Sequence, residues 1–200
     1  MWPEQVDPTA VLLIDVINDF DFVESNLLLR FAMPMAKRLK TLKDRARRAG
    51  LPVIYSNDNF GLWQSSFEVI VDHCLRSKGR EVVRILAPEP ADYFVLKPKQ
   101  SAFYSTSLEV LLNELGVKRL IIGGLAADVC VLFTAMDAFM REYDLCVPSD
   151  CVASSTKLQK DSALRQMADV LKADTRLSSQ IDLEREEPVH AEDHEGVRHN

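Results

Sequence analysis

Histidine is scarce in this chain of 200 residues: it occurs four times, at His73 and then at His190, His194 and His199. A catalytic cysteine usually takes its activating base from histidine, so the sequence does not favour a Cys–His pair. Cysteine is scarce as well, with four residues in all. None of them forms a Cys-x-x-Cys pair or shows zinc-ligand spacing, which argues against a structural metal centre and a dithiol redox motif.

Long apolar runs and dense basic stretches are missing too. No segment approaches the roughly 20 apolar residues that a membrane helix needs, so we expect no membrane association. The formal net charge of -6 argues against a nucleic-acid surface, which requires concentrated positive charge. The first ten residues, MWPEQVDPTA, lack the basic-then-apolar pattern of a signal peptide. We therefore expect a cytoplasmic protein whose cysteines are thiols.

The sequence does contain a regular alternation of short apolar runs and longer amphipathic ones. The apolar runs predict strands at 10–17, 51–58, 92–97, 118–125 and 143–150, with a last edge strand at 175–181. Helical spacing predicts helices at 28–49, 65–77, 107–116, 129–142 and 156–172. This alternation predicts an α/β fold, three layers (α/β/α) around a mainly parallel sheet of about six strands. We place this single domain at residues 1–180 and expect the charged residues 181–200 to form a mobile tail.

Polar residues gather where the predicted parallel strands end, which is where open α/β sheets place their active sites. Asp15 lies near the end of the first strand and Lys97 ends the third, while Asp58, Cys130 and Asp150 follow the second, fourth and fifth. A carboxylate inside the run LLIDVI is costly to bury alone, so Asp15 either serves the site or forms a structural salt bridge. Lys97 taken alone could be a solvated strand-end lysine. For Asp58 and Asp150 we favour a role in capping the following turn.

Cys130 could be a small buried hydrophobic residue, but its position at the start of a predicted helix favours a nucleophile. The positive end of the helix dipole stabilises a thiolate there, and the N–H groups of the first turn can bind an oxyanion. The other three cysteines fall mid-helix, mid-strand and in a loop. Because histidine is scarce, Asp15 is the candidate base, and a nearby Lys97 would stabilise both carboxylate and thiolate.

Three motifs carry these residues in order. VLLIDVINDF has an aspartate on the first strand, LKPKQSAFYSTSLEVLL a lysine ahead of a Ser-x-Phe segment, and IIGGLAADVCVLFTAMDAF a glycine-rich strand end leading to cysteine. From about residue 9 to 155 the chain thereby resembles the isochorismatase-like cysteine hydrolases. The resemblance implies a Rossmann-like strand order, a catalytic triad of Asp15, Lys97 and Cys130, and a non-proline cis peptide at Leu125–Ala126. It also implies an oxyanion hole formed by the N–H groups of Ala126 and Cys130.

Two departures from the family's members refine the expected activity. Nicotinamidases carry an Asp-x-His metal motif after the second strand, and Phe60 stands here where that histidine would follow Asp58. We therefore expect neither a metal nor another cofactor. True isochorismatases often lack the cysteine, whereas this chain retains Cys130. The favoured interpretation is a hydrolase that cleaves a carbon–nitrogen bond of a small amide or ureido compound through a thioester.

Two alternatives remain open. One is isochorismatase-type hydrolysis of an enol ether, from isochorismate to 2,3-dihydro-2,3-dihydroxybenzoate and pyruvate. The other is a non-catalytic interaction module on the same fold. In the enzyme readings we expect Phe20, Asn59, Trp63 and Phe103 to line an apolar slot for the small-molecule substrate. Oligomers are common among the proteins that the chain resembles, which implies a homo-oligomer, either a dimer or a tetramer.

Overall fold

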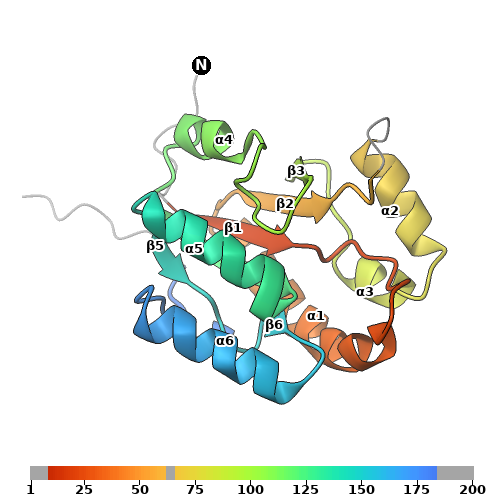
Figure 1. Cartoon of the computed structure of the whole chain (residues 1–200). Helices are drawn as coiled ribbons and strands as arrows, with labels where there is room; N and C mark the ends of the chain where they lie inside the picture. The colour runs from red at the N-terminus through yellow and green to blue at the C-terminus, as the bar shows by residue number, and fades with distance from the viewer. Residues whose placement is uncertain (1–8, 62–65, 184–200) are drawn as a thin grey trace, which may run out of the picture.

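A parallel sheet forms the middle layer of the protein (Figure 1). The computed structural model describes residues 9–61 and 66–183. The strands are β1 (Thr9–Ile14), β2 (Val53–Asp58), β3 (Tyr93–Lys97), β4 (Arg119–Leu125), β5 (Asp144–Cys146) and β6 (Val152–Ala153). Their order is β3-β2-β1-β4-β5, β6 pairs with β4, and all of these pairs are parallel. The predicted α/β fold with about six mainly parallel strands is confirmed.

Helices cover both faces of this sheet. They are α1 (Ser25–Arg48), α2 (Phe67–Leu75), α3 (Arg80–Ile85), α4 (Leu108–Glu114), α5 (Leu132–Met140) and α6 (Lys157–Asp169). A π-helical turn, Ala127–Val131, leads directly into α5, and a short 3-10 turn, Ser178–Gln180, follows α6. Figure 1 shows α4, α5 and α6 on one face of the sheet and α1 and α3 on the other. The predicted three-layer arrangement is therefore also correct.

The central strands β1 and β4 are buried on both faces, which leaves their ends to build a site. In β1, Val11 and Leu13 pack into the core beneath α1, α2 and α3, while Leu12 and Ile14 pack into the core beneath α4, α5 and α6. The alternation follows from the strand's two-residue period, and the continuous aliphatic run is typical of a strand covered on both sides. Helix α1 buries a residue every three or four positions, which is the spacing of a single apolar stripe.

Two of the predicted strands differ in the structure. Residues 175–181 do not form an edge strand, because Arg45 on α1 donates to the carbonyl oxygens of Ser178 and Ile181 at 2.6 and 2.7 Å. The sixth strand is β6, which pairs with the end of β4 instead. The predicted strand at 143–150 ends at Cys146, shortly before Pro148, whose nitrogen cannot donate to a neighbouring strand.

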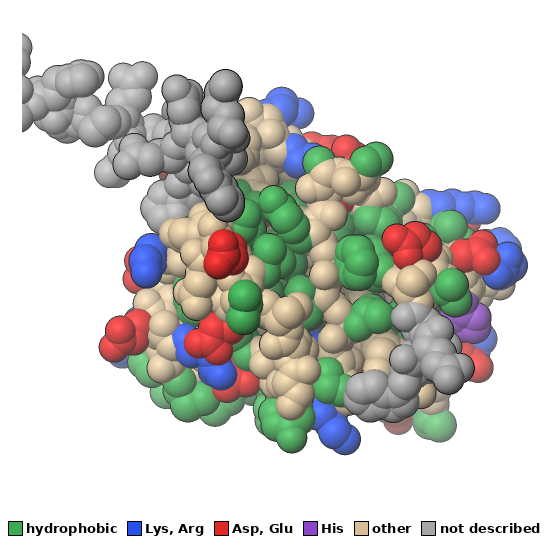
Figure 2. All heavy atoms as spheres, turned by 90° about the horizontal axis from the view of Figure 1, so that it is seen from above, with side chains coloured by type: hydrophobic (Ala, Val, Ile, Leu, Met, Phe, Trp, Pro, Cys, Tyr) green, Lys and Arg blue, Asp and Glu red, His purple; other side chains and the backbone are tan. Residues whose placement is uncertain are grey.

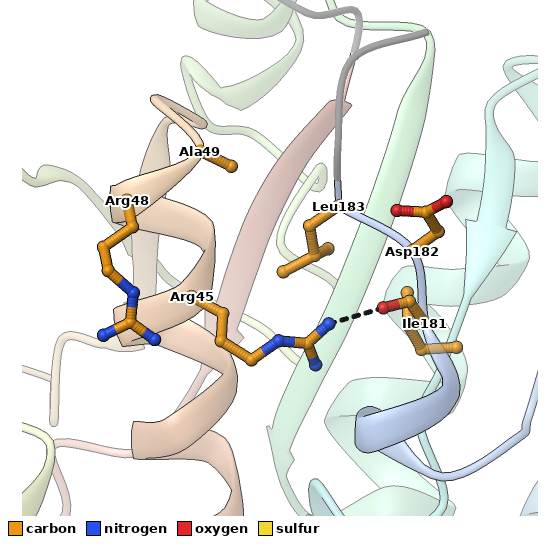
Figure 3. A pocket seen from close by; sticks show the side chains of 6 residues that line it. All are labelled: Arg45, Arg48, Ala49, Ile181, Asp182 and Leu183. Atoms are coloured by element: carbon orange, nitrogen blue, oxygen red, sulfur yellow. Dashed lines mark hydrogen bonds between the residues drawn. The ribbon is translucent and has the colours of Figure 1, made fainter.

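The packed body continues slightly past residue 180, where we placed the end of the domain. Ile181 and Leu183 are buried in the core beneath α1. With Arg45, Arg48, Ala49 and Asp182 they line a pocket of about 330 Å³, shown in Figure 3. Residues 184–200 of the predicted tail lie outside the described residues. Within the part of the chain that is described, no helix is both long and apolar enough to cross a membrane.

Candidate active site

Three side chains from separate strand ends meet at the carboxyl edge of the sheet. Asp15 follows β1, Lys97 ends β3, and Cys130 lies in the π-helical turn after β4. Lys97 Nζ lies 2.9 Å from Asp15 Oδ2 and 3.5 Å from Cys130 Sγ. Lys97 is only 1% exposed and Asp15 6% exposed, so their ion pair is sheltered from water. The structure thus brings together the three residues that the sequence singled out.

Main-chain contacts fix the position of the Asp15 carboxylate. Asp15 has a left-handed backbone with φ of 49°, and its N–H donates to the carbonyl oxygen of Ser56 at 3.0 Å. Its Oδ1 accepts the N–H of Asp58 at 2.8 Å, which leaves Oδ2 for Lys97. Both contacts come from the end of β2, the neighbour of β1. Such backbone partners leave no signature in residue types, so the sequence could not reveal them.

Lys97 reaches the other two residues across the end of β2. Its strand neighbour in register is Asp58, the last residue of β2. Nζ donates to the carbonyl oxygen of Lys99 at 3.0 Å in addition to its contacts with Asp15 and Cys130. A buried ammonium needs this set of acceptors, because an unpaired charge in the interior is strongly destabilising. Lys97 is therefore part of the site rather than a solvated strand-end lysine.

The turn that carries Cys130 is held by hydrogen bonds within the turn and by one from Ser154. The carbonyl oxygen of Ala126 accepts the N–H groups of Val129 and Val131 at 3.0 and 3.2 Å. Ser154, which follows β6, donates its hydroxyl to Asp128 Oδ1 at 2.5 Å. The sequence reasoning missed this Asp128–Ser154 contact. The peptide bond between Leu125 and Ala126 is cis, as the family resemblance implied.

The thiol of Cys130 is neutral at rest. The pKa of this thiol is raised to about 12: burial is the main cause, the negative charge of Asp15 adds to the rise, and Lys97 opposes both effects. This contradicts the expectation that the helix start would favour a preformed thiolate, because burial and Asp15 outweigh the positive neighbours. Burial also raises the pKa of Asp15, against the opposing effect of Lys97. Activation of the sulfur therefore requires a proton acceptor, and the adjacent Asp15 is a stronger base than an exposed aspartate.

Lys97 keeps its positive charge in this setting. Burial alone would lower its pKa, but the negative charge of Asp15, and that of Cys130 once its thiol is ionised, act in the opposite direction and raise it overall. Its ammonium contacts both partners, so it can stay beside the negative charge whether that charge lies on oxygen or on sulfur. Because three groups interact so closely, their titration belongs to the set rather than to any one residue.

The ring of Phe103 packs against two side chains of this chain, and the lining role that we expected for it stays a prediction. The Arg141 guanidinium lies 4.8 Å over its ring, and the ring of Tyr143 lies 6.0 Å away. Both partners follow the carboxyl end of α5, whereas Cys130 precedes its amino end. The neighbouring Ala102 N–H donates to Thr134 Oγ1 on α5 at 3.0 Å. The Ser-x-Phe segment thus clamps the loop after Lys97 onto the helix that follows Cys130.

The other three expected lining residues have different outcomes. Asn59 lies beside the triad, since its N–H donates to the carbonyl oxygen of Lys97 at 3.3 Å. The Phe20 side chain is fully buried and packs in the core beneath α1, so it offers no accessible surface to a ligand in this structure. Trp63 lies outside the described residues.

Of the two aspartates that we expected to cap turns, one does so and the other does not. Asp58 Oδ1 accepts the N–H of Phe60 at 2.6 Å, which confirms its capping role. Asp150 Oδ1 and Oδ2 accept the N–H and hydroxyl of Ser178, each at 2.8 Å. Asp150 therefore anchors the C-terminal segment, and its predicted role in its own turn is wrong.

Around Asp58, where nicotinamidases carry their metal motif, this chain has the aromatic ring of Phe60 and a histidine, His73, that contacts Asp19. The ring of Phe60 lies 6.4 Å from that of His73, and His73 Nε2 lies 3.1 Å from Asp19 Oδ2. Among residues 9–61 and 66–183, no group of three or more His, Cys, Asp and Glu side chains is placed to hold a metal ion.

Comparisons with known proteins agree with the fold and show the family. The family description "Isochorismatase domain" matches residues 9–177. The isochorismatase family protein YaaI of Bacillus subtilis is 42% identical over 172 residues, which cover 86% of this chain and 95% of YaaI. The ureidoacrylate amidohydrolase RutB of Caulobacter vibrioides is 29% identical over 170 residues, 70% of this chain and 76% of RutB. The crystal structure of N-carbamoylsarcosine amidase from Thermoplasma acidophilum superposes with a TM-score of 0.68 at 29% identity, covering 87% of this chain and 98% of the amidase.

Proposed function

The chain belongs to the isochorismatase family, and from that premise we propose that it is a cysteine-dependent hydrolase of a small ureido or amide compound. The observation that carries this proposal is the contact of Lys97 with both Asp15 and Cys130 in a buried site. Nucleophilic acyl transfer needs a thiol as nucleophile, a carboxylate as base and a positive charge that stays beside them, and Cys130, Asp15 and Lys97 can supply these. None of these roles requires a metal ion or a cofactor.

In the proposed first half-reaction, Asp15 takes the thiol proton and the sulfur of Cys130 attacks the substrate carbonyl. The N–H groups of Ala126 and Cys130 hold the oxyanion of the tetrahedral intermediate, a contribution typically of about 3 kcal/mol per donor. The carbon–nitrogen bond then breaks, and the departing nitrogen takes the proton from Asp15. Lys97 stabilises the negative charge while it moves from oxygen to sulfur.

The second half-reaction returns the enzyme to its resting state. Asp15 accepts a proton from water, which attacks the thioester carbonyl, and the proton is then delivered to the departing sulfur. The products are the acid, the amine or ammonia, and the free thiol. Asp15 therefore serves as base and acid in turn, which suits a carboxylate whose pKa burial raises.

The ureido class is the first to test. RutB is named as an amidohydrolase of ureidoacrylate, and the Thermoplasma protein as an amidase of N-carbamoylsarcosine. Both names describe a nitrogen carried by a urea-type carbonyl. Two relatives of similar identity, one matched by sequence and one by structure, thus support a ureido acid ahead of a simple amide.

The decisive experiment measures ammonia release from ureido acids, N-carbamoyl amino acids, simple amides and nicotinamide. We expect turnover of a ureido acid that survives exhaustive dialysis against a chelator. Cys130→Ser should lose at least about 1,000-fold in kcat, whereas Cys74→Ser, a buried cysteine on α2, should not. Quenched reactions should show an acyl adduct on the Cys130 peptide by mass spectrometry.

Three outcomes would overturn the proposal. Pyruvate release from isochorismate that persists in Cys130→Ser would favour enol-ether hydrolysis. Absence of turnover across the panel and of any acyl adduct would favour a non-catalytic module. Activity that disappears with the chelator and returns with added metal would favour metal-dependent chemistry.

A further inference from the structure

The loop that follows β1 carries Asp15 at its first position and has a constrained backbone. Asp15 and Phe20 both have positive φ angles, 49° and 54°, which residues other than glycine rarely adopt. Such a conformation persists only where the surrounding structure imposes it. We call residues 15–20 the Asp15 loop. The contacts of this loop therefore decide where the carboxylate of Asp15 lies.

Three successive residues at the end of β2 hold the Asp15 loop. The carbonyl oxygen of Ser56 accepts the N–H of Asp15 at 3.0 Å, and the N–H of Asp58 donates to Asp15 Oδ1 at 2.8 Å. Between these two residues, Asn57 donates from its side-chain Nδ2 to the carbonyl oxygen of Ile17 at 2.6 Å. Of the three β2 residues, only Asn57 uses its side chain for this purpose. A substitution there can therefore remove one contact of the loop and leave the other two donors and acceptors in the chain.

The link between α2 and α3 packs against the other side of the same loop. A Cβ atom at Gly79 would lie 1.9 Å from the carbonyl oxygen of Asn18 and 2.8 Å from the ring of Phe20. The side chain of Asn18 in turn accepts the N–H of Phe20 at 2.8 Å. The Asp15 loop is thus held between this link and the end of β2.

The amide of Asn57 is not explained by stability alone. Its side chain is fully buried. Figure 2 shows hydrophobic side chains over edge strand β3, which separates β2 from that side of the molecule. Among the described residues Asn57 Oδ1 has no hydrogen-bond partner. A buried amide oxygen without a partner destabilises a fold, and an apolar side chain of the same size would avoid that loss.

We propose that Asn57 is a positioning residue, which holds the Asp15 loop so that the carboxylate of Asp15 stays beside Lys97 and Cys130. The inference rests on the proposed role of Asp15 as the base. Ile17 lies two residues beyond Asp15, so the bond from Asn57 fixes the far side of the turn whose near side the β2 backbone fixes. Without this bond the turn gains freedom, and the carboxylate occupies its place beside Lys97 in a smaller fraction of molecules.

The NMR signal of the Asp58 amide proton tests the proposal without any substrate. This N–H donates to Asp15 Oδ1, so its chemical shift follows the protonation of that carboxyl. Burial raises the pKa of Asp15, so the wild-type signal should titrate above the usual range of an aspartate. Asn57→Leu keeps a similar size and removes the donor. In this variant the carboxyl becomes more hydrated, and the titration should move to lower pH. Asn57→Ala, which removes the same donor with a smaller side chain, should move it in the same direction.

Turnover of the substrate that the ammonia-release panel identifies gives a second measurement. Asn57→Leu should lower kcat by about 30-fold and change KM by less than about 3-fold, because the base moves and the substrate contacts do not. The acid limb of its pH profile should move together with the Asp58 signal.

Tyr55→Phe is the matched control. It removes another buried hydrogen bond of the same strand, from Tyr55 Oη to the carbonyl oxygen of Leu86 at 2.8 Å. We expect it to lower the melting temperature at least as much as Asn57→Leu does. It should nevertheless leave kcat, KM and the Asp58 titration unchanged, because this bond lies away from the Asp15 loop. Circular dichroism establishes that each variant is folded.

Several results would overturn the positioning role. They are an Asp58 signal that titrates in both Asn57 variants as in the wild type, a loss of kcat that Tyr55→Phe reproduces, and failure of both Asn57 variants to fold, which would make Asn57 a structural residue. A wild type that turns over nothing in the panel, together with an Asp58 titration that moves in the Asn57 variants, would contradict the proposed function and still support the positioning of Asp15.

Discussion

At the scale of single residues, the Asp15–Lys97 ion pair contributes to the stability of the fold as well as to the proposed catalysis. Lys97 is buried and depends on Asp15 for its only carboxylate within hydrogen-bonding distance among the described residues. Removing one partner from a buried pair leaves an uncompensated charge, which typically costs about 3–5 kcal/mol. The residue that we propose as the base is therefore also a structural element of the sheet edge.

We predict that Asp15→Asn lowers the free energy of unfolding by about 3 kcal/mol as well as abolishing turnover. The double variant Asp15→Asn/Lys97→Met should recover more than half of that stability, because no buried ammonium remains. Urea unfolding measures both. Asp19→Asn, which breaks the pair with exposed His73, is the control and should cost less than about 1 kcal/mol. An Asp15→Asn chain as stable as the wild type would contradict the prediction.

Cys130 differs from the other cysteines in access rather than in a lowered pKa. Cys74, Cys146 and Cys151 are fully buried, whereas Cys130 is partly exposed. Limited iodoacetamide labelling with peptide mapping should therefore modify Cys130 first. Because the pKa of its thiol is about 12, the labelling rate should still be rising with pH above neutrality. A rate that levels off near neutral pH would mean that the thiolate is preformed, against this reading.

At the scale of elements, the contact between β1 and β4 sets the distance between Asp15 and Cys130. Gly124 on β4 lies in register with Ile14, one residue before Asp15. It has φ of 125°, and a Cβ atom there would lie 2.0 Å from the carbonyl oxygen of Ile14. Only glycine allows the two backbones to approach this closely.

Gly124→Ala should consequently separate the strands, destabilise the fold by more than about 3 kcal/mol and abolish activity. Gly116→Ala is the matched control, since Gly116 also has a positive φ but has no atom within 4 Å of the added Cβ among the described residues. Its free energy of unfolding should fall by only about 1 kcal/mol, the cost of holding alanine in a left-handed backbone conformation. Thermal melts of both variants measure the difference. Equal losses in the two variants would show that the close approach is not what matters.

Helix α1 is joined to the sheet through a buried lysine. Lys43 Nζ donates to Tyr55 Oη and to the carbonyl oxygen of Ala87, both at 2.6 Å, and lies 3.6 Å from Asp92. Burial lowers the pKa of Lys43 to about 8, with Asp92 opposing and the nearby Arg47 and Lys40 adding to the decrease. Burial also raises the pKa of Tyr55.

These shifts predict how stability changes with pH. Between pH 8 and 10 the unfolded chain holds the Lys43 proton and the folded chain releases it, so stability rises by up to about 3 kcal/mol. Above pH 10 the unfolded chain ionises Tyr55 while the folded chain does not, so stability falls again. Urea unfolding across this range measures the curve. Lys43→Met should remove the rise, and a rise that persists in that variant would assign it to another group.

At the scale of the whole molecule, residues 178–183 join parts of the fold that are far apart in sequence. Arg45 on α1 and Asp150 in the turn before β6 bind Ser178, and Ile181 and Leu183 complete the core beneath α1. Segments 28 to 136 residues apart in sequence are joined here. We therefore propose that the folded unit extends at least to Leu183, past the predicted boundary at residue 180.

A chain ending at residue 180 should accordingly be less stable than one ending at residue 183, by about 3 kcal/mol or more. The reason is the loss of two buried aliphatic side chains and of one acceptor for Arg45. Paired urea titrations of the two truncated chains provide the measurement. Equal midpoints would show that residues 181–183 contribute no packing energy.

The sequence alone determined the layers of the fold, and it predicted that Asp15, Lys97 and Cys130 lie together. Periodicity distinguishes strands from helices because side chains alternate every two residues in one and every 3.6 in the other. In a parallel sheet all strands end at the same edge, so Asp15, Lys97 and Cys130 could be assigned to one site without coordinates. The Asp58 turn could likewise be read locally, since its partner lies two residues away.

Only the tertiary structure decided the features that depend on distant partners. Phe103 packs beneath Arg141, Asp150 binds Ser178, and residues 175–181 give their carbonyl groups to Arg45. None of these partners is adjacent in sequence, so a local pattern could not predict the contacts. For Asp150 and for residues 175–181 they replace the predicted role. The protonation of Cys130 belongs to the same class. The helix start favoured a thiolate, but desolvation by the surrounding chain and the charge of Asp15 raise its pKa, and both effects exist only once the chain has folded.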